Sequence, residues 1–421
     1  MSTTLPSNGA GGKYEPSHCI ACQGNSVELF LDLGCTALAN KFLAREDLAR
    51  AEPRFPLRVG FCHDCGHVQL TDTVPPAEMF EDYLYVSSAS TTLKAHLYDL
   101  SDTVVGRLRL GPSDLVVDIG CNDGTLLTGF QRHGVRTVGV DPAVNLAGLH
   151  TPAGFDRFTG FFGADTAPAI VGRWGRASAI TATNTFPHIP DLPGFIKGID
   201  AALAPGGMFV IEAHYLVDLL DQIAFDTVYH EHVSYWALGP MRRLFERWGF
   251  HIVRAERLPI HHGQLRVWVQ RRGEGAPDET VDAILAEEEE QGIPDFETYV
   301  QFARRTETIR ERLTQTLRDL RRNGARLAAY GAPAKGNTLL EYLRLGPDLI
   351  EFIVDRSPLK QGRYTPGTHI PVMPPSRLLD SPPDYVVLLA WNFQDEILSQ
   401  QAEFRRRGGR FIVPVPHVAI L

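Results

Sequence analysis

The sequence predicts an α/β protein in which a small cysteine-containing domain precedes two α/β units. Three observations support this prediction. Two Cys-x-x-Cys pairs lie within the first 80 residues, strand-like and helical patterns alternate from about residue 81 to 275, and the alternation returns after residue 325. Alternation of this kind favours mostly parallel sheets with helices on both faces. A chain of 421 residues is too long for a single domain with one ordinary hydrophobic core, so we expect several domains.

The composition is typical of a globular protein in water, with 44% hydrophobic and 22% charged residues. A formal net charge of -9 argues against nucleic acid or an anionic membrane as the main partner, and no apolar run reaches the ~20 residues of a membrane span. Residues 1–17 lack a basic start followed by an apolar segment, so we expect a flexible tail. We therefore expect a cytoplasmic protein that works as a monomer or weak oligomer.

The two cysteine pairs, Cys19 with Cys22 and Cys62 with Cys65, each lie at a turn where a glycine closely follows the second cysteine. Such tight turns aim both thiolates at one ion, and two of them complete a tetrahedral shell around Zn²⁺. A filled shell leaves no position for a reacting water, so we expect a structural zinc site in a domain over residues 18–80. The alternative is two unrelated redox or buried pairs.

A glycine-containing loop follows the first predicted strand of the central unit. In LVVDIGCNDGTLL, Asp118, Gly120 and Gly124 stand between a buried strand and the start of a helix. Glycine lets the backbone approach a ligand closely, and the free amides of a helix N-terminus favour a carboxylate or phosphate. The spacing lacks the G-x-G-x-x-G fingerprint of dinucleotide-binding loops, so the choice of ligand needs further residues.

Those residues follow the next two predicted strands. Asp141 ends the strand-like run 137–141, where an acid can accept both hydroxyls of a ribose, although Asp141 before a proline is also compatible with a simple turn. Asn184 and His188 follow the run 178–184 and reach the same carboxyl edge of the sheet. The combination is similar to that of class I S-adenosylmethionine-dependent methyltransferases.

The C-terminal part begins after a turn-rich boundary at residues 271–279. Charged helical patterns lead to a basic run before Gly324, and a second α/β pattern follows with strands predicted at 325–331, 349–355 and 384–391. Lys335 lies beside Gly336 at the start of a predicted helix, a suitable seat for a diphosphate, and Asn337 adds a polar group. Arg363 is a further candidate for the same cleft, and the alternative is a loop that only packs the domain.

Five motifs then occur in one order: the paired cysteines, D-I-G-C-N-D-G, N-T-F-P-H-I-P, Y-H-E-H and Y-G-A-P-A-K-G-N-T. Across residues 18 to 420 they resemble the sugar C-methyltransferases of deoxysugar biosynthesis, which include the tetronitrose enzyme. The resemblance implies a zinc domain (18–80), a class I methyltransferase domain with a Rossmann-like fold (81–275) and a second Rossmann-like domain that helps to bind a nucleotide-sugar (276–421). It implies S-adenosylmethionine as cosubstrate and, as residues that bind it, Asp118, Gly120, Asn122, Gly124, Asp141 and Asn184.

The same resemblance implies a reaction and its catalytic residues. The usual substrate is a dTDP-4-keto-deoxysugar that is methylated at C-3, and the family's catalytic residues fall on Tyr229, Glu231, His232 and His188. Since the C-3 proton is acidic only when the C-4 carbonyl takes the charge, a base and an oxygen donor are both needed. We expect His232 to be the base, Glu231 to orient it or hold substrate hydroxyls, and Tyr229 or His188 to steady the enolate oxygen.

Two further segments carry weaker expectations. His261, in LPIHHGQLRV, is a candidate for substrate binding, although His262 stands where the family has a glycine. The lead-in YLYVSSAS at residues 83–90 is expected either to cover the methyl donor or to be a simple linker. Other readings stay open: C-methylation of another keto-sugar or nucleoside-type molecule, O- or N-methylation of a small metabolite, or a nucleotide-sensing scaffold without catalysis.

Overall fold

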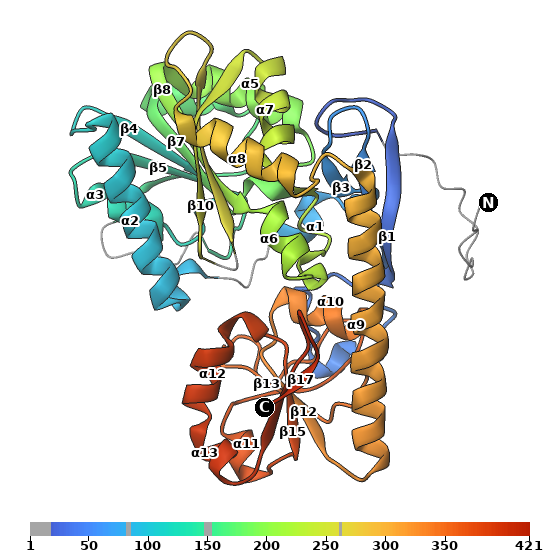
Figure 1. The fold of residues 1–421 in the computed structure, drawn as a ribbon. Helices are drawn as coiled ribbons and strands as arrows, with labels where there is room; N and C mark the ends of the chain where they lie inside the picture. Colours follow the sequence, from blue (N-terminus) through green and yellow to red (C-terminus); the bar gives the residue numbers. More distant parts are fainter. Residues whose placement is uncertain (1–17, 81–85, 147–153, 261–262) are drawn as a thin grey trace.

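The computed structural model describes residues 18–80, 86–146, 154–260 and 263–421, and the chain forms three sheets (Figure 1). The first sheet is built from β1 (Val27–Thr36), β2 (Phe55–Cys62), β3 (Val68–Leu70) and β9 (Ser234–Tyr235), in that order and antiparallel. The strand β9 comes from the middle of the chain, directly after Y-H-E-H. The N-terminal domain therefore holds one end of the predicted catalytic segment.

The central sheet has seven strands in the order β10-β11-β8-β7-β4-β5-β6. Its strands are β4 (Leu115–Ile119), β5 (Arg136–Asp141), β6 (Asp156–Thr159), β7 (Ala177–Thr183), β8 (Leu203–His214), β10 (Phe250–Leu258) and β11 (Gln264–Arg271). The five strands from β6 to β8 run parallel, whereas β11 is antiparallel to both of its neighbours. The strand order reverses between β4 and β7, which opens a ligand crevice at their carboxyl ends.

Helices cover this sheet because its strands are apolar on both faces; all five residues of β4, for example, are buried. The helices are α2 (Thr91–Leu108), α3 (Thr125–Gln131), α4 (Ala167–Trp174), α5 (Leu192–Ala202), α6 (Leu216–Asp221) and α7 (Leu238–Arg247). On one face, Leu97 of α2 and Phe130 of α3 pack with Val116 and Trp268 of the sheet. The chain's largest apolar cluster occupies the other face and also takes in buried side chains of the N-terminal and C-terminal sheets.

The C-terminal part begins with α8 (Glu279–Glu290) and the long helix α9 (Phe296–Arg322), which runs alongside β1 and down to the third sheet (Figure 1). Helix α9 stops at a basic turn followed by Gly324, whose φ of +84° favours glycine, as the sequence predicted. Tyr299 of α9 contacts the rings of Phe30 and Phe61 on the N-terminal sheet. Although α8 falls within residues 276–421, it packs on β10 and α7 of the central domain.

The third sheet has the order β14-β13-β12-β15-β16-β17, with all pairs parallel except the last. Its strands are β12 (Leu327–Tyr330), β13 (Ile353–Val354), β14 (Val372–Met373), β15 (Tyr385–Leu388), β16 (Arg410–Val413) and β17 (Ala419–Ile420), and its helices are α10 (Ala334–Tyr342), α11 (Arg377–Asp380), α12 (Gln394–Gln400) and α13 (Ala402–Arg406). The order reverses between β12 and β15, which marks a second ligand crevice.

The α/β fold class with its three parts is confirmed. The strand expected at 349–355 is reduced to the two residues of β13, and the two-residue strand β9 was not predicted. The domain limits at 80 and 275 stay predictions, and the tail 1–17 lies outside the described residues. Of the helices in the described part of the chain, none is both long and apolar enough to cross a membrane.

Candidate active site and metal centre

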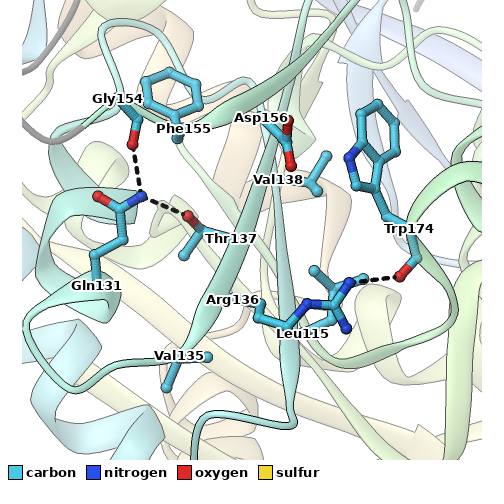
Figure 2. A pocket seen from close by; sticks show the side chains of 10 residues that line it. All are labelled: Leu115, Gln131, Val135, Arg136, Thr137, Val138, Gly154, Phe155, Asp156 and Trp174. Atoms are coloured by element: carbon cyan, nitrogen blue, oxygen red, sulfur yellow. Dashed lines mark hydrogen bonds between the residues drawn. The ribbon is translucent and has the colours of Figure 1, made fainter.

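A surface pocket of about 410 Å³ lies at the amino ends of β4, β5 and β6 (Figure 2). Its polar groups bond to one another: Nε2 of Gln131 donates to the Gly154 carbonyl at 2.8 Å, and Arg136 donates to the Trp174 carbonyl at 3.1 Å. The pocket lies at the edge of the sheet opposite the glycine loop, and it is lined by none of the predicted site residues. Because open α/β sheets bind ligands at the carboxyl ends of their strands, we place no function in this pocket.

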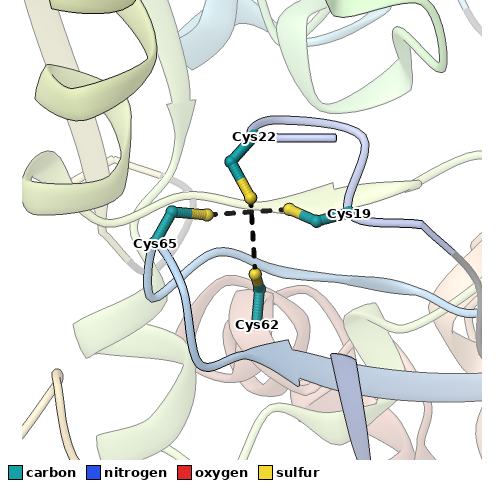
Figure 3. Close-up of side chains that lie close together, drawn as sticks. All are labelled: Cys19, Cys22, Cys62 and Cys65. Carbon is teal, nitrogen blue, oxygen red and sulfur yellow. Dashed lines mark hydrogen bonds between the residues drawn. The ribbon is translucent and has the colours of Figure 1, made fainter. Parts of the chain in front are cut away.

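The four cysteines predicted to bind zinc lie together, with their sulfur atoms all within 4.8 Å of one another (Figure 3). Sγ of Cys19 is 3.6 Å from that of Cys65, and Sγ of Cys22 is 3.6 Å from that of Cys62. A tetrahedral ion with Zn–S bonds of ~2.3 Å would hold its sulfur atoms ~3.8 Å apart, so the spacing fits zinc. Two turns create it: the amide of Gly66 donates to the Cys62 carbonyl, and that of Gln23 donates to the Cys19 carbonyl.

The electrostatics of this cluster favour a bound cation. Burial, with the nearby Cys19, raises the pKa of the Cys62 thiol to about 12. The pKa of Cys65 is raised as well, by its contact with Cys19 and by burial. Four thiolates, three of them buried, cannot carry their charges side by side without a positive ion between them. Cys35 and Cys121 lie apart from the cluster; both were expected to be buried, which is correct for Cys121, whereas Cys35 is exposed.

The loop after β4 has the backbone conformation that its glycines predicted. Gly120, Asn122 and Gly124 all have positive φ, at +74°, +52° and +79°. A Cβ atom on Gly120 would lie 2.0 Å from Oγ1 of Thr185, and one on Gly124 would lie 2.1 Å from the Phe155 ring. The loop thus needs glycine both for its conformation and for its neighbours, as expected of a cradle around a ligand.

Asp141 braces this loop from the end of β5. Its carboxylate accepts hydrogen bonds from the amides of Asn122 and Ala143, both at 2.8 Å, and Arg157 lies 3.4 Å away. Asp118 is also buried; Thr181 donates to it at 2.7 Å, while burial raises the pKa of its carboxyl to about 7. Sequence analysis missed Arg157, because its role depends on a contact across two strands.

The lead-in segment contacts the same loop. The amide of Ser87 donates to the side chain of Asn122 at 2.9 Å, and that of Ser88 donates to Asp123 at 2.9 Å. Of the two expectations for this lead-in, a cover over the methyl-donor loop agrees with these bonds. Tyr83, which begins it, lies outside the described residues.

The end of β7 completes the edge. Asn184 has a φ of +56°, and its side-chain oxygen accepts from Gln264 of β11 at 2.7 Å. Nearby, the buried Oγ1 of Thr183 and Oε1 of Gln264 have no protein hydrogen-bond partner among the described residues. Buried polar atoms of this kind need partners, and a polar cosubstrate can supply them. These features and the glycine cradle fit S-adenosylmethionine.

Beneath this edge lies an ionic network that the sequence did not reveal. Glu212 of β8 accepts from Nε of Arg266 at 2.6 Å and from Nε2 of His96 at 2.7 Å. Burial alone would raise the pKa of Glu212, but the bonds from His96 and Arg266 outweigh it and lower the pKa. The network fixes α2, which carries His96, on the sheet.

The predicted catalytic histidines lie in one cluster at the carboxyl edge. The ring of His232 is 5.2 Å from that of His188 and 5.2 Å from that of His214, measured between centroids. Nδ1 of His232 lies 2.8 Å from the Thr227 carbonyl, which can only accept, so Nδ1 carries the proton. Nε2 therefore holds the lone pair, and the Tyr229 hydroxyl donates to it at 2.8 Å.

Burial keeps these imidazoles neutral. It lowers the pKa of His232 to about 3, and the neighbouring His188 adds to the effect. Burial likewise lowers the pKa of His188 to about 3, with a contribution from His214. His230 has a different environment: it stacks edge-on with Phe55 and contacts the Pro56 carbonyl at 3.2 Å, in agreement with a packing role.

Glu231 lies at a junction of all three domains. Nδ2 of Asn40, from the loop between β1 and β2, donates to its carboxylate at 2.7 Å. Lys360 of the C-terminal domain is close enough for the charge of Glu231 to act on its ammonium group. Neither Asn40 nor Lys360 was singled out for this position, because the partners are far apart in sequence.

The C-terminal loop places Lys335 at its crevice, with Nζ 4.2 Å from the centroid of the Trp391 ring. Lys335 follows β12 and Trp391 follows β15, the two strands between which the strand order reverses. Trp391 also lines a pocket of about 550 Å³ at the ends of β15 and β16. Asn337 is buried and donates to the Ala39 carbonyl at 2.6 Å, a bond between domains. Arg363 is exposed, and His261 lies outside the described residues.

Three family models match consecutive parts of the chain: a zinc binding domain over residues 19–80, a methyltransferase domain over 95–255 and a C-methyltransferase C-terminal domain over 259–416. The C-methyltransferase NovU of Streptomyces niveus is 39% identical over 407 residues, which cover 96% of each protein. The chain belongs to this family of C-methyltransferases. As a C-methyltransferase it is an enzyme that uses S-adenosylmethionine, and its four cysteines form a zinc site.

Two further matches each cover less than half of this C-methyltransferase. A ubiquinone biosynthesis O-methyltransferase of Methylobacterium sp. (strain 4-46) is 31% identical over 122 residues, which are 27% of this chain and 48% of the relative. A solved S-adenosylmethionine-dependent methyltransferase of Geobacter sulfurreducens, in complex with S-adenosyl-L-homocysteine, has a TM-score of 0.34 and 15% identity, and covers 48% of this chain and 99% of its own. The roles of individual site residues in the C-methyltransferase stay predictions.

Proposed function

We propose that this enzyme methylates C-3 of a nucleoside-diphosphate 4-keto-deoxysugar, with dTDP as the expected nucleotide. The observation that carries the proposal is the Tyr229–His232 pair, a neutral base and a hydroxyl donor held 2.8 Å apart at the carboxyl edge of the central sheet. The C-terminal domain has a second crevice, where the ammonium group of Lys335 lies over the Trp391 ring. One elongated ligand with a sugar and a diphosphate suits two such neighbouring sites.

The pair supplies what a carbon acid requires. In the proposed step the C-3–H bond breaks, its proton passes to Nε2 of His232, and its electrons form the C-3–C-4 double bond of an enolate. The Tyr229 hydroxyl, released from Nε2 by that proton, turns to the enolate oxygen. S-adenosylmethionine would supply the methyl group: its methyl–sulfur bond breaks as the bond to C-3 forms, S-adenosylhomocysteine leaves, and the C-4 carbonyl re-forms. Because His232 starts neutral, the step creates an imidazolium beside the enolate, and the two charges stabilise each other.

Glu231 has the position of a substrate holder. The sequence left two roles open for it, but Nδ1 of His232 is oriented by the Thr227 carbonyl, which leaves the binding of sugar hydroxyls as the role that the geometry favours. Asn40 fixes the carboxylate from the zinc domain, and Lys360 balances its charge from the C-terminal domain. Lys360 itself is anchored on the Ala332 carbonyl at 2.8 Å. The sugar would then meet residues of all three domains.

Exchange of the C-3 proton with solvent tests the base directly. In D₂O, without S-adenosylmethionine, the wild type should incorporate deuterium at C-3 of a dTDP-4-keto-deoxysugar. The His232→Asn variant should slow this exchange by about 100-fold or more, the usual contribution of a general base, because the amide cannot take up the proton. Its affinity for S-adenosylmethionine, measured by calorimetry, should be unchanged. His230→Asn is the matched control and should exchange normally, since His230 faces Pro56.

Two results would contradict the proposal. Normal exchange in the His232→Asn variant would exclude His232 as the base. Absence of exchange in the wild type, together with transfer of a labelled methyl group to oxygen or nitrogen, would favour the rival reaction of O- or N-methylation. Mass spectrometry of products from a panel of keto-sugar nucleotides would then identify the substrate.

A further inference from the structure

A buried carboxylate of the central domain faces the Lys335 loop. Asp226 lies in the short 3-10 helix η4 (Phe225–Thr227) and is completely buried. Its Oδ2 accepts a hydrogen bond from Nε1 of Trp391 at 2.6 Å. Its Oδ1 is also buried and has no hydrogen-bond partner among the described residues. Burial raises the pKa of Asp226, so a nearby positive charge is needed to keep this carboxyl group ionised.

Lys335 is that charge. Its ammonium group lies over the same Trp391 ring that binds Asp226, and the two opposite charges attract each other across the domain boundary. Burial lowers the pKa of Lys335 to about 8, and Asp226 opposes this change. Other charged groups near this loop include Asp355, which accepts from the Ala332 amide, and Lys360, which donates to the Ala332 carbonyl. Asp395 and Glu396 line the pocket beside Trp391, and Glu396 accepts from Arg356. Asp226 is the acid whose charge acts on the Lys335 ammonium.

The contact also reaches the catalytic pair through the backbone. Asp226 is followed directly by Thr227, whose carbonyl accepts a hydrogen bond from Nδ1 of His232 and so fixes the proton on that nitrogen. The ring of Phe225, on the other side of Asp226, packs at 5.4 Å against Tyr342 of α10. The short helix η4, whose Thr227 orients His232, is thus fixed against α10, the helix that carries Lys335.

We propose that Asp226 is a positioning residue for the nucleotide-sugar: it holds the Lys335 ammonium over Trp391, where it can meet the diphosphate, and keeps that ammonium charged. This role rests on the proposed function of Lys335 as a diphosphate ligand. It assigns the central domain a part in a site whose other residues all belong to the C-terminal domain. A pair that only fastened the two domains would stabilise the fold without changing how phosphate binding depends on pH.

The test uses the full-length, zinc-loaded enzyme with dTDP as the probe. Asp226→Asn preserves the shape and can still accept from Trp391, but it removes the negative charge. If the pKa of Lys335 falls by ~1 unit as a result, the Kd for dTDP rises about threefold at pH 7.5 and about eightfold at pH 8.5, and hardly changes at pH 6.5. Asp221→Asn, at an exposed acid of the same domain, is the control for net charge and should leave these values unchanged.

A double-mutant cycle of Asp226→Asn and Lys335→Met distinguishes a failure of the Asp226 proposal from a failure of the proposed phosphate site. If Lys335→Met weakens dTDP binding while Asp226→Asn leaves both the Kd and its pH dependence unchanged, Asp226 has no positioning role, although the phosphate site stands. If Lys335→Met has no effect either, the phosphate site itself is wrong. In the double variant, the effect of Asp226→Asn should disappear, because no ammonium is left to hold. A lower unfolding midpoint with an unchanged pH profile would show a purely structural pair and overturn the proposal.

Discussion

Burial keeps His232 and His188, two of the predicted catalytic residues, neutral. The rings of His188 and His214 each contact that of His232, so a proton on His232 is opposed both by the lack of water and by any charge on its neighbours. Such a cluster favours the form of His232 that accepts a proton. The Thr227 carbonyl then decides which nitrogen accepts it. The Thr227 carbonyl thus determines that the Tyr229 hydroxyl donates to Nε2 of His232.

The same burial predicts a pH dependence of stability. In the unfolded chain His232 takes up a proton near pH ~6.5, but its folded pKa is about 3, so between these values only the unfolded state binds the proton. The contribution of His232 to stability is therefore complete above pH ~6.5 and is lost, at about 1.4 kcal/mol per pH unit, as the pH falls below it. Asp118, whose folded pKa is raised to about 7, acts with the opposite sign.

A comparison of two variants isolates the histidine. Urea unfolding of the wild type and of His232→Asn between pH 7.5 and 5.5 should show that the difference in unfolding free energy changes by roughly 1.4 kcal/mol in favour of the variant at pH 5.5. Asp118 acts equally in both proteins and cancels. Zinc content must be constant across the series, because protonated thiols release the metal. A difference that does not change with pH would mean that His232 is protonated in the folded state.

At the scale of residues, some of the site residues can be predicted from the sequence and others cannot. The cysteines could be predicted, because a zinc knuckle is a local pattern whose spacing alone fixes the geometry. Y-H-E-H could be found from its resemblance, and the roles expected within it stay predictions. Asn40 and Asp226 could not be found, since each acts on a residue more than 100 positions away. Nothing in their surroundings in the sequence distinguishes them from ordinary polar residues of a turn.

At the scale of elements, the strand-loop-helix unit from β4 to α3 is the best example of local consistency. A fully buried strand, three residues of positive φ and a helix start follow one another within 15 residues. The sequence shows such a unit because buried parallel strands are continuous apolar runs and glycine marks the loop. By contrast, β9 has only two residues and exists because β3 offers it an edge, so no periodicity could reveal it.

Gly120 gives this unit a test. Alanine at this position would combine a φ of +74° with a Cβ atom 2.0 Å from Oγ1 of Thr185. We expect Gly120→Ala to lose about 1–3 kcal/mol of stability from backbone strain and to weaken S-adenosylmethionine binding by about tenfold or more. Differential scanning fluorimetry and calorimetry measure the two effects. Gly111→Ala, where a Cβ meets open space, is the control. Wild-type affinity in Gly120→Ala would show that the loop does not cradle the cosubstrate.

At the scale of the whole molecule, the zinc domain serves as a clamp. Its loop between β1 and β2, residues 37–54, contacts both other domains: Asn40 binds Glu231, the amide of Ala37 donates to Glu341 of α10 at 3.1 Å, and Leu43 exchanges two backbone bonds with Tyr364. The sequence predicted three domains but not this contact, because a polar loop carries no sign of the surface that it will cover. The four cysteines lie at the other end of the β1–β2 hairpin, next to the Val27–Cys62 pair, so the hairpin itself connects the metal to this loop.

This arrangement predicts that a zinc-domain residue affects catalysis without affecting the metal. Asn40→Ala removes one hydrogen bond to the Glu231 carboxylate, a charge-assisted bond worth about 1.5–3 kcal/mol, so kcat/KM for the keto-sugar nucleotide should fall by about 10- to 100-fold. One equivalent of zinc should remain bound, because the four cysteines are untouched. Lys41→Ala, at the exposed neighbouring residue, should have wild-type kinetics. Unaltered turnover in Asn40→Ala would mean that Glu231 is held by other groups, and the zinc domain would then act on the fold alone.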